Sequence, residues 1–397
     1  MTAYLAIIVL LFLFACAENG RFESKYPGRI SCLTLILFGG LRHETGFDWV
    51  EYENYYNLIL PISASRPEYI TYNLLVEPGF QFFCLILRSL GASFQTFLFV
   101  VTFVNIVVIY IFARRYTSRV ALVFLIYFGF IFLAGQMAAI RQTFSYSFIL
   151  LAFIQRDREK SLSTALMLII AVSIHSFSIV FIPIMYWRFR YISTPLLTAV
   201  VGIGVAAAFS GFHIVPIIAD VFLPVLSGGF VATKLSLYGD YEGTRISLVS
   251  LSFIPLHLAA YFLLTTRRFH RAFYPTTITY FAASVTLLIL ICHSYFGVFP
   301  AFWNRVSYLA FFLQAVALSA RYREYFQGGS VPAVSIGLAG AAGVAIITYT
   351  LNQPTSLPFT PYQNVVIAWA TGDPGDGRLR YEYAFREAEI EIAKRRR

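Results

Sequence analysis

The sequence has little charge and few cysteines. Asp, Glu, Lys and Arg together make up only 13% of its 397 residues, whereas a soluble globular domain has about 25%. The four cysteines, at positions 16, 32, 84 and 292, lie in apolar stretches without the spacing of metal ligands, so neither a disulfide framework nor a metal site is predicted. No repeat or low-complexity array is visible. The scarcity of charge argues against a soluble globular protein.

Hydrophobic residues are abundant instead. They account for 58% of the chain, and the mean hydropathy is +0.69. Apolar runs long enough to cross a hydrocarbon core of about 30 Å occur repeatedly, which predicts an all-α, polytopic integral membrane protein. The first run, 2–17, has neither a basic region before it nor a small-x-small cleavage site after it, so we expect a retained helix and not a signal peptide.

The net charge of +10 comes mainly from Lys and Arg in short loops. In a membrane protein such loops indicate orientation, so we expect basic cytoplasmic loops and no nucleic-acid partner. Placing every basic cluster on one side gives about twelve transmembrane helices with the N-terminus outside. The expected helices cover residues 2–17, 30–41, 95–113, 119–136, 141–155, 161–174, 176–191, 194–211, 246–266, 275–292, 303–320 and 331–350.

Two choices determine this arrangement. Residues 77–90 are short, begin with Glu-Pro-Gly and contain Arg88, so we expect an interfacial helix on the outer surface. The apolar stretch 161–187 could form one tilted helix, but a break at His175-Ser176 keeps the later basic clusters cytoplasmic. We therefore predict that the helix is interrupted at His175-Ser176.

The predicted organisation is one transmembrane domain followed by a tail. The domain covers residues 1–350, with outer loops at 42–94 and 212–245. Residues 351–397 form a C-terminal loop and a charged, amphipathic tail. The basic end of this tail argues against an outer location, and the side on which it lies stays open.

Polar residues that hydropathy does not explain gather on the predicted outer side. An ionisable group beside hydrocarbon costs several kcal/mol unless it is paired, so each is a functional candidate. Each also has a structural interpretation: Arg42 and Arg305 could anchor at headgroups, Asp48 could cap a helix, and Arg141 could form a salt bridge to Glu77 or Asp48. The set comprises Arg42, Glu44, Asp48, Glu77, Arg141, Gln142, His175, Lys234, Tyr238, Asp240, Asn304 and Arg305.

Their chemistry suits a diphosphate and a sugar. Guanidinium groups bind phosphate oxygens with two donors. A neighbouring Asp, Glu or His could take a proton from a sugar hydroxyl. Tyr52 and Tyr55 offer ring faces for sugars. Together these residues predict glycosyl transfer from a lipid diphosphate at the outer leaflet.

Six short motifs follow one another along the chain. They are "LRHETGFDWVEYENYY", "VEPGFQFF", "AAIRQTFSYSFIL", "AVSIHSFSIVFIPI", "FWNRVSYL" and "TPYQN". In this order the chain resembles the EpsG-type, Wzy-like polymerases of bacterial surface polysaccharides, such as O-antigen and exopolysaccharide. Phe47 and Trp49 around Asp48 depart from the family pattern, in which Thr and Tyr are more usual, and so does the basic tail.

The resemblance implies a substrate class and a location. The substrates would be undecaprenyl-diphosphate-linked oligosaccharide repeat units at the outer face of the bacterial inner membrane. The growing chain would leave its lipid diphosphate and join a hydroxyl of a new unit, without sugar nucleotides. The architecture would be similar to that of multi-helix, GT-C-like glycosyltransferases with lipid-linked donors. Partners would include membrane lipids, a chain-length-regulating membrane protein and a flippase; no cofactor is predicted, and metal dependence stays open.

The candidate residues divide by role. Asp48, His175 and Glu77 are the catalytic candidates, and Asp48 is preferred to His175 as the base because it lies beside Tyr52. Arg42, Arg141 and Arg305 are expected to bind the diphosphate. The residues expected to bind the sugars or the acceptor are Glu44, Trp49, Tyr52, Tyr55, Gln142, Tyr238, Asn304 and Tyr362.

Three other functions remain alternatives. A transporter or flippase of lipid-linked oligosaccharide would need a polar path across the membrane, whereas the cytoplasmic halves of the expected helices are nearly free of ionisable groups. An O-antigen-ligase-like glycosyltransferase would differ only in its acceptor. A membrane O-acyltransferase would need a histidine on the path to acyl-CoA, for which His257 and His270 are weak candidates.

Overall fold

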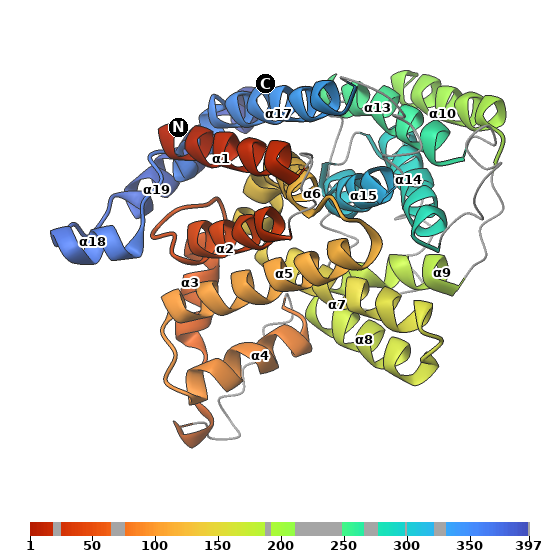
Figure 1. Ribbon diagram of the computed structural model, residues 1–397. Coiled ribbons are helices and arrows are strands. Elements are labelled where there is room, and N and C mark those ends of the chain that lie inside the picture. The colour runs from red at the N-terminus through yellow and green to blue at the C-terminus, as the bar shows by residue number, and fades with distance from the viewer. Residues whose placement is uncertain are drawn as a thin grey trace, which may run out of the picture. The chain divides into compact units, whose positions relative to one another are not determined.

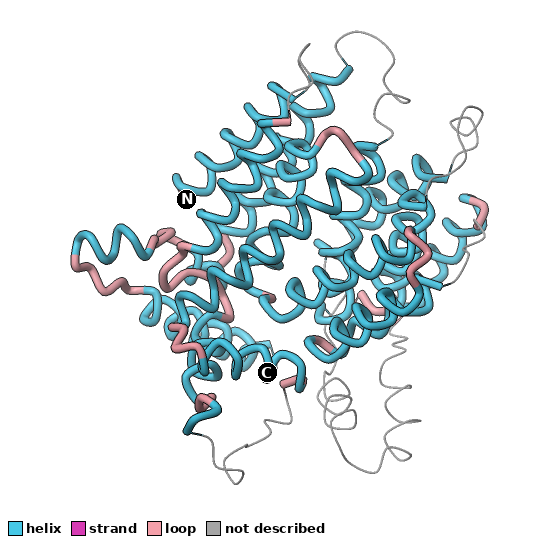
Figure 2. The backbone as a smooth tube through the Cα atoms, turned by 60° about the horizontal axis from the view of Figure 1, so that its bottom comes forward, coloured by secondary structure: helices cyan, strands magenta, loops and turns pink. Residues whose placement is uncertain are grey.

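In the computed structural model, the described residues are almost entirely helical (Figure 1). They are 1–18, 25–64, 76–186, 192–210, 248–265, 277–297, 300–320 and 331–395. Within these ranges there is no β-strand, and the one β-like pairing is an isolated bridge between Arg42 and Asn364. The all-α class predicted from the sequence is therefore confirmed. Helices make up most of the described part of the tube in Figure 2.

The chain forms two compact units. The first contains Met1–Thr71, Glu77–Ile179 and Ser319–Arg397, and the second contains Tyr72–Val76 and Val180–Leu318. The α-helices of the first unit are α1 (Thr2–Glu18), α2 (Tyr26–Gly40), α3 (Trp49–Leu58), α4 (Pro78–Ser89), α5 (Phe94–Tyr116), α6 (Val120–Tyr127), α7 (Ile140–Asp157), α8 (Ser161–Ile174), α17 (Val331–Leu351), α18 (Val365–Thr371) and α19 (Gly377–Arg395).

The second unit contains five described helices. They are α9 (Phe181–Tyr186), α10 (Thr194–Phe209), α13 (Leu248–Thr265), α14 (Thr277–Tyr295) and α15 (Pro300–Ala320), the last two residues of which belong to the first unit. Within this unit α14 packs against both α13 and α10. Buried polar side chains link its helices, since Gln314 contacts the ring of His257 and donates to the Thr286 hydroxyl at 2.9 Å.

Apolar helix faces and small residues hold the first unit together. In this unit α2 packs on α5, α1 on α6 and α17, and α7 on α8 and α5. A Cβ atom at Gly129 would lie 2.6 Å from the Cα of Gly343, so the two backbones approach where neither residue has a side chain. Such small-residue contacts are typical of packing between membrane helices.

Each of the twelve expected helices corresponds to a helix in the structure, with two departures. Residues expected to form one regular helix at 119–136 are α6 followed by a π-helix, Phe128–Ala138. The wider π-turns are rare and often lie near functional sites. The helix expected at 176–191 begins as a 3₁₀ segment, Ser176–Val180, and continues as α9 to Tyr186; residues 187–191 are outside the described chain. The predicted break at His175 is present.

Four described helices are long and apolar enough to cross a membrane by length and composition. They are Phe94–Tyr116, Val120–Ala138, Thr277–Tyr295 and Val334–Leu351, and shorter apolar helices accompany them. By contrast, α4 has only 12 residues, or about 18 Å of helix. It buries Phe80, Cys84 and Leu87 on one face. It is too short to cross a membrane, and its predicted position on the outer surface stays a prediction.

The C-terminal segment packs on the chain that follows α2. The Tyr4 hydroxyl donates to the Phe359 carbonyl at 2.7 Å, and the Val365 N–H donates to the Leu41 carbonyl at 2.8 Å. Beyond this point α18 lies at the edge of the unit and α19 turns back (Figure 1). The side of the tail was open from the sequence; the structure places it at the end of the first unit that contains Arg42.

Candidate active site

Three segments far apart in the sequence meet at Arg141. The Arg141 guanidinium, in the first turn of α7, pairs with the Glu77 carboxylate at 2.9 Å. The other oxygen of Glu77 accepts from the Ser176 hydroxyl at 2.9 Å and from the Ser176 N–H at 3.1 Å. Glu77 thus joins the start of α7 to the segment at which the helix is interrupted after α8. We call Arg141, Glu77, Ser176, Tyr52 and Asp48 the Arg141 cluster.

The Glu-Pro-Gly-Phe element explains how Glu77 reaches this position. Pro78 starts α4 because its fixed φ suits the first helical residue. A Cβ at Gly79 would lie 2.8 Å from the backbone carbonyl carbon of Ser173, so only glycine lets α4 approach α8 this closely. Phe80 then packs on Tyr52 and Tyr55, with ring centroids 6.0 and 6.1 Å apart. Each residue of the element therefore has a distinct structural task.

Aromatic rings surround the Arg141 guanidinium. Its central carbon lies 5.9 Å from the ring centroid of Tyr52 and 5.9 Å from that of Phe80. Both distances suit cation–π contacts. The Arg141 side chain is 24% exposed, so a ligand can still reach it although it is paired. Tyr52 and Tyr55 are half-buried beside it.

Asp48 precedes α3 without serving as its side-chain cap. It occupies the N-cap position, but its carboxylate makes no cap hydrogen bond. Burial raises the pKa of Asp48 to about 6; the positive charge of Arg141 opposes this shift, and the negative charge of Glu51 adds to it. A carboxylate with no capping bond and a pKa near the physiological range is suited to exchange protons.

The other two catalytic candidates, Glu77 and His175, are more buried than Asp48. One carboxylate oxygen of Glu77 pairs with Arg141, and the other accepts hydrogen bonds from Ser176. His175 is buried directly after α8, where its backbone N–H donates to the Ala171 carbonyl. Gln142 points into the bundle, and its amide donates to the Tyr146 hydroxyl at 2.8 Å. Among the catalytic candidates, Asp48 alone combines half-burial with a carboxylate that has no hydrogen-bond partner among the described residues.

Arg42 lies in a different environment. Its side chain is 1% exposed, and its Nη1 donates to the Gln136 carbonyl at 3.3 Å. It forms no ion pair within the described part of the chain, and its Nε has no hydrogen-bond partner there. Burial lowers the pKa of Arg42 to about 10, and the nearby Tyr362 and Tyr4 act in the opposite direction. The group therefore keeps its charge at neutral pH while covered by protein.

The C-terminal segment contacts Glu44 and Trp49, which were expected to bind sugars, and contains a third such residue, Tyr362. The Glu44 carboxylate accepts from the Gly377 N–H at 2.9 Å. Trp49 is 3% exposed, and the Arg378 guanidinium lies 5.8 Å from its ring centroid. Tyr362 stacks on Phe38 at 4.2 Å. In this arrangement the Trp49 ring is covered, so a sugar could stack on it only after the segment moves.

Two further candidates belong to the second unit. Asn304 and Arg305 lie half-buried in α15, and Trp303 beside them packs against His293 with ring centroids 5.0 Å apart. Tyr238 lies outside the described residues, as do Lys234, Asp240 and His270. His257 is buried and contacts Gln314. In the described ranges, no group of three or more His, Cys, Asp and Glu side chains gathers around a potential metal position.

Sequence reasoning missed several parts of this site. Ser176 was noted only as part of a helix break, although it binds Glu77 through two donors. Phe80 was noted only within a motif, and Arg378 lies in a tail to which no role was assigned. The Gln136 carbonyl could not be foreseen, since the irregular π-helix brings it to Arg42. A serine next to a histidine at a predicted helix break was the one available signal.

Comparison with known proteins gives one match. The sequence model of the EpsG family matches residues 25–364. No curated protein and no solved structure matches the chain. The matched range includes every residue of the Arg141 cluster and ends at Asn364, so α18 and α19 lie beyond it.

Proposed function

The chain belongs to the EpsG family, and on this premise we propose that it is a polysaccharide polymerase. It joins oligosaccharide repeat units that are carried on a lipid diphosphate, undecaprenyl diphosphate in a bacterial inner membrane. The observation that supports this best is the Arg141 cluster. It combines a reachable guanidinium, aromatic ring faces and a carboxyl group with a pKa of about 6.

In the proposed reaction, Asp48 acts as the general base. The acceptor hydroxyl gives its proton to the Asp48 carboxylate, and the hydroxyl oxygen bonds to the anomeric carbon of the growing chain. The bond between that carbon and the diphosphate oxygen breaks, and its electron pair leaves with the lipid diphosphate. A base whose pKa lies near the working pH is efficient in such a step.

Arginines stabilise the leaving group in this proposal. Charge that develops on the diphosphate is met by fixed cationic donors. Arg141 is the first of them because its partner Glu77 holds it in place while 24% of its side chain stays exposed. Arg305, in the second unit, stays a predicted diphosphate-binding residue. Arg42 is covered by the C-terminal segment, so its participation requires that segment to move.

The sugars are proposed to bind over Tyr52 and Tyr55. Their rings lie next to Phe80 and Arg141, where a sugar face could stack while its hydroxyl approaches Asp48. His175, Gln142 and Asn304 stay as predicted contributors. About twelve membrane spans, a GT-C-like architecture, and a flippase and chain-length regulator as partners belong to the same proposal.

The orientation of the Arg141 cluster is part of the proposal, and cysteine labelling tests it. We expect Asn57→Cys, on an exposed position of α3, to react with an impermeant maleimide in spheroplasts when the native cysteines are replaced. Arg158→Cys, exposed after α7, should react only after the membrane is opened. Labelling of position 158 alone in closed spheroplasts would reverse the proposed orientation.

The activity is tested with purified full-length protein and lipid-linked repeat units. A ladder of products that differ by one repeat unit is expected from a polymerase. A single product with a different acceptor would instead support the ligase-like alternative. Transport of the intact substrate across a vesicle membrane without new glycosidic bonds would support the flippase alternative and contradict the proposal.

A further inference from the structure

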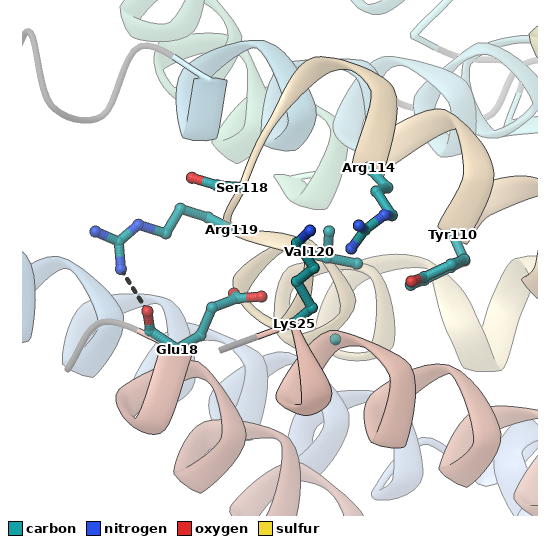
Figure 3. Close-up of a pocket in the computed structure, with 8 residues that line it drawn as sticks. Glu18, Lys25, Tyr110, Arg114, Ser118, Arg119 and Val120 are labelled. Carbon is teal, nitrogen blue, oxygen red and sulfur yellow. Dashed lines mark hydrogen bonds between the residues drawn. The ribbon is translucent and has the colours of Figure 1, made fainter. Parts of the chain in front are cut away.

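A hollow opens at the other end of the helices that lead to the Arg141 cluster. Arg42 follows the C-terminal end of α2, whereas this pocket lies at the N-terminal end of α2 and the C-terminal end of α5. It has a volume of about 90 Å³ (Figure 3). A phosphate group fits a space of this size.

Close contacts between helix ends build the frame of the pocket. The Glu18 carboxylate accepts from the Ala121 N–H at 2.8 Å, at the start of α6. Arg119 Nη1 donates to the Glu18 carbonyl at 3.0 Å. A Cβ at Gly28 would lie 2.8 Å from the Cβ of Val120, so glycine permits α2 to approach α6. The frame is therefore fixed by contacts that do not involve a ligand.

Four side chains that line the pocket are hydrogen-bond donors without a bonded acceptor in the described part of the chain. Lys25, Tyr110, Arg114 and Ser118 all contribute side chains to it, as Figure 3 shows. Among the described residues, none of these four side chains forms a hydrogen bond or an ion pair, and the Glu18 carboxylate is already bound at α6. Donors that share a hollow and lack an acceptor are suited to an oxyanion.

Charge and helix direction favour an anion there as well. The lining has three cationic side chains, Lys25, Arg114 and Arg119, against one carboxylate. Lys25 is the N-cap of α2, and the first turn of α2 contains no acidic residue. A cation beside a helix N-terminus is unfavourable unless an anion lies nearby.

The position of the pocket indicates which anions can reach it. A helix of 23 residues such as α5 is about 34 Å long, which is close to the thickness of a membrane. Phe94 and Phe97 at the start of α5 pack near Tyr56, on the side of the Arg141 cluster, whereas Arg114 lies in its last turn. Basic pockets between membrane helices on the cytoplasmic side suit lipid headgroups.

We propose that this pocket binds a phosphate group, that of an anionic lipid in the leaflet opposite the Arg141 cluster. Lys25 and Arg114 supply the charge, and the hydroxyls of Tyr110 and Ser118 complete the contacts to phosphate oxygens. Binding there would join the ends of α1, α2, α5 and α6. This inference does not depend on the proposed polymerase activity.

The test measures lipid binding to the detergent-purified full chain by native mass spectrometry. The probe is phosphatidylglycerol, and diacylglycerol serves as a lipid without phosphate. The double variant Lys25→Gln/Arg114→Gln should bind phosphatidylglycerol on the order of tenfold more weakly than the unaltered protein. The matched control, Arg158→Gln/Lys160→Gln, removes two exposed charges after α7 and should bind it normally.

A competition with inorganic phosphate distinguishes the two sources of the phosphate group. If millimolar phosphate leaves phosphatidylglycerol bound, the ligand is a lipid headgroup; if it displaces the lipid from the unaltered protein only, a soluble phosphate compound fits the same pocket. Equal binding of phosphatidylglycerol to the pocket variant and the control overturns the proposal. Should the double variant not fold, Tyr110→Phe removes one donor, and unchanged binding by that variant overturns it equally.

Discussion

Two arginines in the first unit, Arg141 and Arg42, were expected to bind the same diphosphate, yet their surroundings differ. Arg141 is paired with Glu77 at 2.9 Å and is 24% exposed. Arg42 is 1% exposed and has no ion pair among the described residues. A carboxylate partner fixes Arg141 while leaving one side open to a ligand. Arg42 is instead enclosed by chain, so a charge near a helix end does not by itself indicate a binding site.

The largest expected effect is that of Arg141→Lys on activity. Lysine keeps the charge but cannot reproduce the planar fork that binds Glu77 and a phosphate oxygen together. We expect the rate of chain elongation to fall by about 100-fold or more, as for the loss of an oxyanion-stabilising group. The measurement is the rate of ladder formation from lipid-linked repeat units.

A matched arginine on α4 provides the control. Arg88 donates to the Ile59 carbonyl at 3.2 Å and lies 5.4 Å from the Tyr56 ring centroid, but it does not contact Arg141 or Glu77. Arg88→Lys should elongate chains at nearly the rate of the unaltered protein. If Arg141→Lys is equally active, Arg141 is a structural ion-pair residue and the proposed diphosphate site is wrong.

The second prediction contrasts the two arginines by stability. Glu77→Gln removes the carboxylate of a partly buried pair, in which Arg141 is 24% exposed, so the cost should be about 1.5–3 kcal/mol, less than for a fully buried pair. Arg42→Met removes a buried charge that has no carboxylate partner, so the free energy of unfolding should change by less than about 1 kcal/mol. Denaturant unfolding of both variants in the same detergent measures the difference. Equal destabilisation would remove the distinction between the two environments.

The helices of this fold were predictable, whereas the details of their ends were not. Continuous apolar runs bounded by basic loops predicted helices at twelve places where the structure has them, because a segment in hydrocarbon must satisfy its own backbone; that all twelve cross the membrane stays a prediction. The π-helix from Phe128 to Ala138 carries no sequence signal that separates it from an α-helix. It depends on how the bundle packs. The break at His175 was predictable because it was needed to keep the basic loops on one side.

The third prediction concerns the pH dependence of elongation. A base must be deprotonated, and burial raises the pKa of Asp48 to about 6. The value of kcat/KM should therefore rise with pH through about 6 and then level off. Glu51→Gln removes a negative charge that raises this pKa, so the rise should move to lower pH.

Glu53→Gln is the control for this shift. Glu53 pairs with Arg378 at 2.6 Å and is not among the groups that act on Asp48. Its pH profile should match that of the unaltered protein. Asp48→Asn should abolish the rise at pH 6; if it elongates chains at a normal rate while folded, Asp48 is not the base.

The smallest expected effect belongs to the tail. Arg378 is 48% exposed, so its pair with Glu53 is worth less than about 1 kcal/mol. Arg378→Gln should leave stability within that range but uncover Trp49. We expect a change in the KM for the acceptor and not in kcat, measured with repeat units of different length. No change in either constant would mean that the tail does not influence the acceptor.

The residues of the candidate site could be predicted from the sequence, but which of them lie together in space could not. Glu77, Arg141 and the helix interruption at His175 could be recognised because charged residues and helix interruptions are rare in apolar sequence. Their convergence depends on tertiary packing, for which Gly79 is required. The covering of Arg42 depends on a segment more than 300 positions away, and spacing along the chain carries no information about such a contact.

That covering has a consequence for biosynthesis. Tyr4 and Phe359, which form one of its hydrogen bonds, are 355 positions apart, so the N-terminal partner enters the membrane long before the C-terminal one is translated. Until then Arg42 must stay in contact with water or headgroups. We expect ribosome-bound chains that end before Pro354 to be more sensitive to proteases near residue 42 than chains released after α19.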